Sequence, residues 1–479
     1  MNLQQSVFKS FSWNSLSALS ITSIQILQLS IVAHFLQPTD FGLMALTQMV
    51  LSFSTIFIDM GASNAIIQKQ NISQSQLSGI YTLNIAIGMA FFTIMVSCAP
   101  IIAFFFGNET LTPVIRVSSL SLLISPLGQQ YRVLLQKSLN FKHIAIIDIL
   151  GSFFSIIVAT ILAIIGYGVY SLVFALLINT MIISTGNLYV GKKYFATPKL
   201  TLKFYELKDI LQFGMFQMGE KTINYFASQV DKMVIGKWLG MDNLGLYNIA
   251  WNLIIFPITR INPIFTQVAF SVFSKFQNDS NKLSNYYARL ITVIMNLNTP
   301  LLLGIFLTAN EIVYVLYGTK WEKASGIIRI LSLSGILKTF ANPGGAIILA
   351  KGRADISFYI NIFWIIIITS FSYHAAITFG TLESMAYSQL LATALIGIFW
   401  HYLVAKYGEI AYINILRIAL KAIILSLAMS FIVYFIGQYI EFRTTLTLII
   451  KSFIGVLSYI LLLLFFNRKT FDLVTIWRK

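Results

Sequence analysis

Charged residues are scarce in this sequence, and so are the residues of most catalytic and cofactor sites. Only 10% of the 479 residues are charged, whereas soluble domains carry about 25%. The single cysteine, Cys98, excludes an intrachain disulfide and a Cys-rich metal site. The histidines show no HExxH spacing, and the glycines form no GxGxxG or Walker pattern. We therefore expect no metal, no nucleotide and no other cofactor.

Long polar segments are absent as well. No stretch between apolar segments exceeds about 20 residues, so a separate soluble domain is excluded. The longest loop on the predicted outer side, 309–326, contributes only Glu311, Lys320, Glu322 and Lys323. A membrane-bound polymerase, ligase or glycosyltransferase usually needs a larger loop or domain that carries catalytic acids, histidines or arginines. The sequence therefore argues against an enzyme.

Apolar residues dominate what remains, at 57% of the chain. They form fourteen segments, each long enough to cross a bilayer core of about 30 Å as a helix. The runs are too long and too continuous for the short alternating strands of a transmembrane β-barrel. We predict an all-α polytopic membrane protein with spans at 12–36, 41–60, 79–106, 113–131, 144–166, 169–190, 209–236, 244–270, 290–308, 327–349, 356–378, 385–405, 418–437 and 446–467.

The formal net charge is +16, and the distribution of the basic residues indicates membrane topology rather than binding to nucleic acid. With the N-terminus in the cytoplasm, 21 of the 33 Lys and Arg residues lie in inner loops and ends, and four lie in outer loops. This asymmetry is the positive-inside pattern, and it predicts that both termini are cytoplasmic. Attraction to anionic membrane lipids is a secondary role for the same charges. Lys9 precedes an apolar segment without a small-residue cleavage site, which predicts a first spanning helix rather than a removable signal peptide.

The chain contains an internal repeat. Residues 31–46 match residues 234–249 at an offset of 203, with Gly42 aligned to Gly245 and Leu43 aligned to Leu246. Three later matches follow in the same order, with offsets up to 214. Two six-helix repeats of equal orientation imply a pseudo-two-fold axis along the membrane normal. We predict an N-terminal lobe at 1–200, a C-terminal lobe at 201–410 and an appended helix pair with a cytoplasmic tail at 411–479.

The hairpin 211–275 carries more polarity than lipid tolerates. Glu220, Asn224, Ser228 and Asp231 fall on one face of its first helix, and Lys221 lies beside them. A charge at bilayer depth costs at least about 3 kcal/mol, so this face should meet water or a partner. We interpret the protein as a transporter whose path this hairpin lines.

Two further cations and a second polar stripe complete the candidate site. Arg260, between Pro257 and Pro263, either lines a cavity or pairs with Glu220 or Asp231, and Lys338 also lies near mid-span. Helix one carries a neutral stripe that either lines a channel or hydrogen-bonds neighbouring helices, formed by Asn14, Ser17, Gln25 and Gln28.

The acids have a second candidate use, which is uptake of H⁺ or Na⁺. The candidates are Asp231, Glu220, Asp148 and Asp59. Glu220 lies deep enough for a raised pKa, and the adjacent Lys221 is an alternative source of compensating charge. Asp59 and Asp148 lie near cytoplasmic helix ends, where we expect solvated or capping roles.

Three segments resemble one transporter family. The turn LQPTDFG at 36–42 looks like the L-x-P-x-[ED]-[FY]-G turn of oligosaccharide-lipid flippases. Residues 231–253 resemble the D-x-x-x-x-G-x-x-L-G segment of the same proteins. Residues 268–279 resemble an F-P-x-[FL]-S-[KR] segment, with Ser271 in place of the usual proline. Together with the 6+6+2 arrangement, they are most similar to Wzx-type polysaccharide exporters, in the colanic-acid branch of the multidrug/oligosaccharidyl-lipid/polysaccharide (MOP) superfamily.

The resemblance implies a bacterial inner-membrane flippase for undecaprenyl-pyrophosphate-linked sugar repeat units, acting next to a polysaccharide polymerase. Related lipid II flippases carry Arg residues in their first two helices, and this chain has none there. A cation-coupled small-molecule exporter of the same superfamily stays open as the alternative. Fourteen helices and several cations within the spans favour the phosphate-bearing lipid.

Overall fold

A computed structural model describes residues 3–61, 63, 66–67, 72–201, 207–410, 412–439 and 443–466. Every regular element in this part of the chain is helical, because only a helix satisfies its own backbone hydrogen bonds in a solvent that offers none. The chain packs into two compact units, each described here by itself. Unit 1 contains residues up to Gln229 together with Gly240–Gly245, and unit 2 contains Val230–Leu239 and Leu246 onward.

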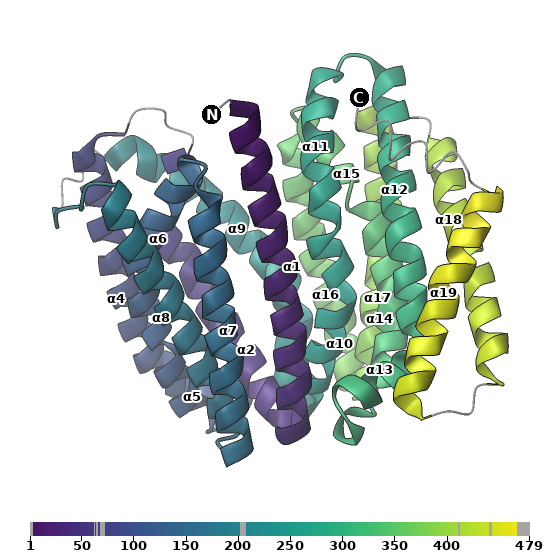
Figure 1. The fold of residues 1–479 in the computed structure, drawn as a ribbon, viewed down its shortest axis with the longest axis horizontal. Helices are drawn as coiled ribbons and strands as arrows, with labels where there is room; N and C mark the ends of the chain where they lie inside the picture. The colour runs from purple at the N-terminus through teal and green to yellow at the C-terminus, as the bar shows by residue number, and fades with distance from the viewer. Residues whose placement is uncertain are drawn as a thin grey trace. The chain divides into compact units, whose positions relative to one another are not determined.

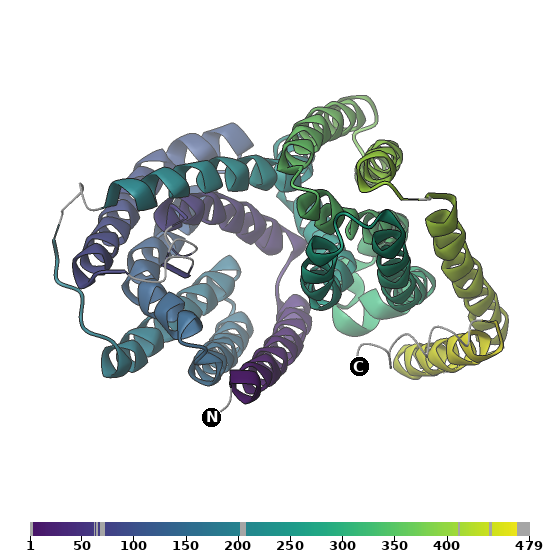
Figure 2. The ribbon, with the colours of Figure 1, turned by 90° about the horizontal axis from the view of Figure 1, so that it is seen from above.

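Unit 1 is a bundle of helices (Figure 1). α7 lies between α1 and α8, α6 packs on α8, and α2 packs on α4 (Figure 2). One part of its core joins α2, α4 and α6 through Leu51, Ile58, Met95 and Leu122. Its helices are α1 (Leu3–Phe35), α2 (Pro38–Asp59), α4 (Gln74–Phe106), α5 (Leu111–Ser118), α6 (Leu120–Lys137), α7 (Phe141–Ile165), α8 (Val169–Tyr194) and most of α9 (Lys208–Val234).

Unit 2 is organised around α12, which packs on α11, α14 and α18. α14 also packs on α17, and α16 lies beside α17. The elements of this unit are the end of α9, the π-helix η2 (Ile235–Leu239), α10 (Gly240–Arg260) from Leu246, α11 (Asn262–Lys275), α12 (Ser280–Leu307), α13 (Ala309–Leu316), η3 (Thr319–Trp321), α14 (Ala324–Ala341), α15 (Gly344–Ala350), α16 (Ala354–Thr378), α17 (Leu382–Gly408), α18 (Tyr412–Gly437) and α19 (Thr444–Phe466).

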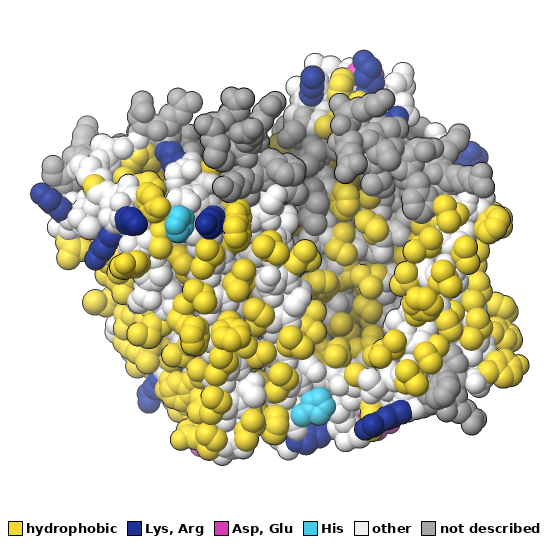
Figure 3. All heavy atoms as spheres, viewed as in Figure 1, with side chains coloured by type: hydrophobic (Ala, Val, Ile, Leu, Met, Phe, Trp, Pro, Cys, Tyr) yellow, Lys and Arg dark blue, Asp and Glu magenta, His cyan; other side chains and the backbone are white. Residues whose placement is uncertain are grey.

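Twelve spans among the described residues are long and apolar enough to cross a membrane. On the face seen in Figure 3, apolar side chains cover the middle of each unit, and Lys and Arg gather near the helix ends. The all-helical, multi-pass fold expected from the sequence is confirmed. The other two predicted spans correspond to α9 and to α10 with α11, which are not among the helices that meet the length and hydropathy of the twelve.

The boundaries of three predicted spans differ from the structure. Span 244–270 is broken at Ile261, between α10 and α11. Span 327–349 is broken at Asn342 and Pro343, between α14 and α15, and span 113–131 is divided at Ser119. Apolar periodicity continues across such breaks, so hydropathy alone merges the two helices.

The appended helices α18 and α19 lie side by side at one edge of unit 2 (Figure 2). α18 packs along α12, and two polar contacts attach α19 to the rest of the unit. Lys451 of α19 pairs with Glu311 of α13 at 2.5 Å, and the Tyr459 hydroxyl donates to the Asn296 amide oxygen of α12 at 2.9 Å. This helix pair is therefore an integral part of unit 2.

One junction outside the spans joins three elements of unit 2. Glu409, directly after α17, accepts a hydrogen bond from the Ser280 hydroxyl at the start of α12. Lys351, directly after α15, lies 3.4 Å from the same carboxylate. The Ser280 hydrogen bond and the Lys351 charge lower the pKa of Glu409 below its ordinary value.

This junction predicts an acid-sensitive contribution to stability. The native pKa lies below the unfolded value of about 4.3, so the unfolded chain binds the proton more tightly. The ionised Glu409 therefore contributes fully to stability above about pH 4.3, and this contribution is lost as pH falls through the native pKa. We expect Glu409→Gln to lower the Tm of the detergent-solubilised protein at pH 7, and the difference from wild type to shrink toward zero below pH 4.

The control is Glu109→Gln, which removes an exposed carboxylate after α4. It should leave the Tm unchanged at both pH values. An equal loss of Tm at pH 7 and at low pH would mean that the Glu409 charge does not stabilise the junction.

Candidate functional site

Two broken helices shape the candidate site in unit 2. α10 contains Pro257 and ends at Arg260, and Pro263 sits in the first turn of α11. α14 ends at Ala341, and Pro343 precedes α15. Proline cannot donate a backbone hydrogen bond and clashes with the preceding turn, so it favours a break at each place. Discontinuous membrane helices often line substrate and ion sites, because their ends present unpaired backbone groups.

Three asparagines connect the two breaks to each other and to α12. The Asn298 amide donates to the Asn262 oxygen at 2.6 Å, and the Asn262 amide donates to the Asn342 oxygen at 3.1 Å. Asn262 and Asn298 are fully buried. Buried amides are costly unless they are hydrogen-bonded, so this chain fixes the position of one break relative to the other.

Lys338 lies in the last turn of α14, directly before its break. Its Nζ is 4.3 Å from the ring centroid of Trp251 on α10 and 5.1 Å from that of Trp364 on α16. Cation–π contacts are worth about 0.5–2 kcal/mol each, depending on desolvation. A cation at the C-terminal end of a helix is also favoured by the helix dipole. The ammonium is therefore held within the span by aromatic rings, and no acid among the described residues forms an ion pair with it.

Asp231 supplies the anionic part of the same region. Its side chain is 4% exposed, and its Oδ2 accepts a hydrogen bond from the Tyr247 hydroxyl at 2.7 Å. Tyr247 is fully buried and stacks on Trp251, with centroids 6.0 Å apart and an interplanar angle of 16°. The Asp231 charge acts on Lys338 as well. We call this group the Lys338 cluster: Asp231, Tyr247, Trp251, Lys338 and Trp364.

Arg260 is exposed in the last turn of α10, two residues before the amide chain. The interpretation that Arg260 pairs with Asp231 is wrong, since Asp231 accepts from Tyr247 and the described residues include no Arg260–Asp231 ion pair. The side chain of Glu220, the other suggested partner, lies outside the described residues. Arg260 and Lys338 share one feature: each lies in the last turn of the helix that precedes a break.

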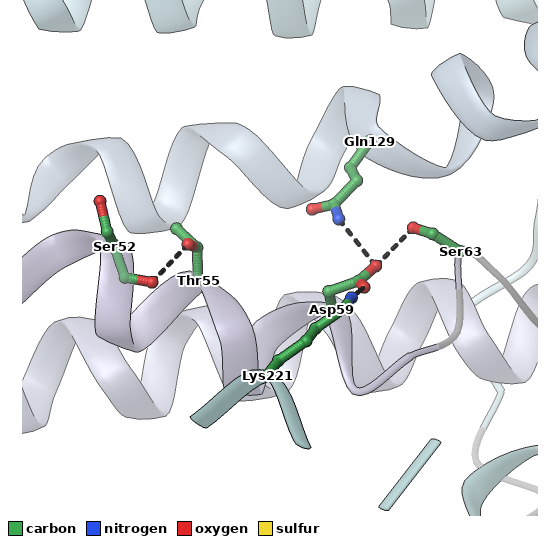
Figure 4. Close-up of polar contacts among 6 residues, drawn as sticks. All are labelled: Ser52, Thr55, Asp59, Ser63, Gln129 and Lys221. Atoms are coloured by element: carbon green, nitrogen blue, oxygen red, sulfur yellow. Dashed lines mark hydrogen bonds and ion pairs between the residues drawn. The ribbon is translucent and has the colours of Figure 1, made fainter. Parts of the chain in front are cut away.

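Lys221 is bound within unit 1 (Figure 4). Its Nζ lies 3.0 Å from Oδ2 of Asp59, the last residue of α2. The other oxygen of Asp59 accepts from the Gln129 amide at 3.1 Å and from the Ser63 hydroxyl. Asp148 is likewise paired, accepting two hydrogen bonds from Arg132 at 2.5 and 2.7 Å. The expected solvated or capping roles of Asp59 and Asp148 are wrong, because both carboxylates form partly buried ion pairs.

The rest of the predicted stripe on α9 is divided in the structure. Ser228 is exposed and donates back to the Tyr225 carbonyl of its own helix at 2.8 Å, and Asn224 is also exposed. Among the described side chains of this stripe, only Asp231, at the end of α9 that belongs to unit 2, is buried. Equal helical spacing predicted one face, but the residues of that face lie in different surroundings.

The stripe on α1 is divided as well. Ser17 is buried, and Gln28 accepts from the Ser155 hydroxyl of α7 at 3.5 Å. For Gln28 the structure therefore favours hydrogen bonding between helices over a channel lining. Asn14 and Gln25 are exposed.

Known proteins match most of this chain. A family model described as "Polysaccharide biosynthesis protein" matches residues 31–326. The chain belongs to this family. The teichuronic acid biosynthesis protein TuaB of Bacillus subtilis is 29% identical over 473 residues, covering 96% of each chain. The lipopolysaccharide biosynthesis protein WzxC of Escherichia coli is 30% identical over 372 residues, covering 76% of this chain and 74% of its own.

Among solved structures, the lipid II flippase MurJ in an inward closed conformation superposes with a TM-score of 0.72. It covers 95% of this chain and 99% of its own at 17% sequence identity, a likeness that concerns the fold. The resemblance to Wzx-type polysaccharide exporters of the MOP superfamily is confirmed, and so is a multi-pass membrane protein of that fold.

Sequence reasoning selected Asp231 and Lys338 but missed Tyr247, Trp251 and Trp364. Tyr247 and Trp251 are four residues apart on α10, a spacing that places them on one helix face. That spacing was the available signal. An aromatic pair in an apolar helix is ordinary core, however, and only the structure places Lys338 over the Trp251 ring.

Two conservative substitutions in the Lys338 cluster should lower the free energy of unfolding by different amounts. Tyr247→Phe leaves Asp231 without its buried donor, which should destabilise the protein by about 1–3 kcal/mol. Trp251→Phe keeps an aromatic face for Lys338 but weakens the cation–π contact, and should cost less. Thermal unfolding of both variants in detergent checks this order. A Tyr247→Phe variant as stable as wild type would show that Asp231 does not depend on that hydroxyl.

Proposed function

We propose that the protein moves an undecaprenyl-pyrophosphate-linked oligosaccharide repeat unit across the bacterial inner membrane. It does so by alternating access, as a step in surface polysaccharide biosynthesis, and hands the product to a polysaccharide polymerase. Both termini lie in the cytoplasm, in agreement with 21 of the 33 Lys and Arg residues in predicted inner segments. The role is transport rather than catalysis.

The observation that carries this proposal is the Lys338 cluster. Moving a pyrophosphate-linked sugar needs a cation for the phosphate and flat aromatic surfaces with hydrogen-bonding groups for the sugar. Lys338 presents an ammonium between two indole rings, and Tyr247 and Asp231 provide hydrogen-bonding groups beside them. Arg260, exposed at the neighbouring helix break, is the second phosphate contact.

The Asp231 carboxylate supports coupling of transport to H⁺ or Na⁺. It is buried and bonded to a neutral hydroxyl rather than to a guanidinium. The same carboxylate also suits the alternative function, a cation-coupled small-molecule exporter. The cargo therefore distinguishes the two functions, and the ion does not.

Lipid-linked intermediates in a deletion strain separate these functions. A flippase predicts that complete repeat units on their lipid carrier accumulate in the cytoplasmic leaflet, and that the wild-type gene clears them. Normal levels of these intermediates, together with sensitivity to small toxic compounds, would favour the exporter and overturn the flippase.

Lys338 should be required for transport but not for folding. We expect Lys338→Met to abolish clearance of the intermediates, because it removes the phosphate-binding charge and retains the apolar stem over Trp251. Lys338→Arg should keep partial function. The matched control is Arg329→Gln on the same helix, which should transport normally. Normal transport by a folded Lys338→Met protein would exclude Lys338 as a phosphate contact.

Arg260→Ala should also abolish complementation of the deletion strain while the protein still inserts and folds. Arg260 is exposed and terminates α10, and no described acid forms an ion pair with it, so its removal leaves no described acid without its partner. Protein level and a monodisperse size-exclusion profile report folding, and surface polysaccharide reports function. Full complementation by the alanine variant would refute its role as a phosphate contact.

A further inference from the structure

Two hydrogen bonds join the helix ends that carry Arg260 and Lys338. Arg260 is the last residue of α10, and Asn262 begins α11 directly after the break. Lys338 lies in the last turn of α14, and its carbonyl oxygen accepts from the backbone N–H of Asn342 at 3.0 Å. The Asn262 amide donates to the Asn342 side-chain oxygen at 3.1 Å. The two ends, each with its cation, are therefore linked through Asn262 and Asn342.

Asn298 of α12 sets the orientation of this link. Its amide donates to the Asn262 oxygen at 2.6 Å, so that oxygen faces α12 and the NH₂ group of Asn262 faces Asn342. Asn262 and Asn298 are fully buried, whereas Asn342 is exposed. Turning the buried Asn262 amide over would place donor against donor and acceptor against acceptor, which is costly away from water. The link is therefore anchored inside unit 2 and ends at the break that follows Lys338.

The two cations lie at different levels along α10. The Lys338 Nζ is 4.3 Å from the ring centroid of Trp251, and Arg260 follows Trp251 by nine residues on the same helix. At 1.5 Å per residue this separation is about 13 Å along the helix axis. Side chains on a helix lean toward its N-terminus, which brings the Arg260 side chain toward the level of Lys338. This arrangement suits two neighbouring phosphate groups better than a single one.

We propose that Asn262 and Asn342 are positioning residues that make the site selective for a pyrophosphate-linked carrier over a monophosphate-linked one. The inference rests on the proposed function, because it takes Arg260 and Lys338 as the phosphate contacts. With the link formed, the two helix ends keep one spacing, and a pyrophosphate gains a charge-assisted hydrogen bond from each cation. A monophosphate gains this bond from one cation only.

Binding of two short lipids to the purified protein in detergent tests this selectivity. We expect the wild type to bind farnesyl pyrophosphate about tenfold more tightly than farnesyl phosphate, since the second cation adds about one charge-assisted hydrogen bond. Asn262→Leu should weaken binding of the pyrophosphate about tenfold and change binding of the phosphate less than about twofold, because Lys338 still contacts one phosphate. A loss of packing alone would weaken both lipids by the same factor, so the ratio of the two affinities reports positioning.

Two further variants control for stability. Asn342→Ala removes the same link at an exposed side chain, so it leaves no buried cavity and should reduce the ratio as Asn262→Leu does. Asn296→Leu is the matched control, because this buried amide lies on α12 near Asn298 but bonds to Tyr459. It should lower the Tm and leave the affinity ratio unchanged.

The outcomes separate the selectivity from the transport role. Equal affinity of the wild type for the two lipids overturns the selectivity, and so does an unchanged ratio in a folded Asn262→Leu or Asn342→Ala protein. Either result leaves the flippase function standing. Failure of the wild type to bind either lipid overturns the selectivity together with the phosphate-binding role of Lys338.

Discussion

Charge inside hydrocarbon is the constraint on which the rest of this structure depends. A single Lys, Arg or Asp at the centre of a membrane helix costs about 2.5–3.5 kcal/mol, even on the lowest scale. Three acids near or within the spans are matched by a basic partner from another helix: Asp59 by Lys221, Asp148 by Arg132, and Glu311 by Lys451. These pairs fix helices to one another. They also remove these six side chains from the set available for transport.

The Lys338 cluster follows a different arrangement. Its acid is bonded to a tyrosine, and its cation lies over indole rings. Neither partner carries an opposite charge, and a cation–π contact is worth about 0.5–2 kcal/mol. A phosphate arriving at Lys338 would therefore displace little, whereas a phosphate arriving at Lys221 would have to compete with Asp59. Charged side chains that are already in an ion pair thus have a structural role, whereas Lys338, whose described contacts are with aromatic rings, can still bind an anion.

The sequence indicated the helices, the repeat and the family, because long apolar runs, the offset of 203 residues and the LQPTDFG turn are local signals. It did not indicate contacts between side chains that are far apart in the sequence. Lys221 and Asp59 are 162 residues apart, and their ion pair leaves no local pattern. The helix break after Arg260 was also missed, although Pro257 and Pro263 flank it, because the apolar pattern continues through it. The helices were predictable from the local pattern, but the contact partners of their side chains were not.

The repeat also shows that symmetry of the backbone does not extend to chemistry. At the offset of 203, Asp231 corresponds to Gln28, Tyr247 to Met44 and Trp251 to Gln48. Gln28 accepts a hydrogen bond from α7. The same position is therefore a link between helices in the first repeat and an acid in the second. Gly42 and Gly245, by contrast, are identical in residue and in contact. The repeat therefore keeps the residues of a close backbone contact and changes the residues that carry charge and hydrogen bonds.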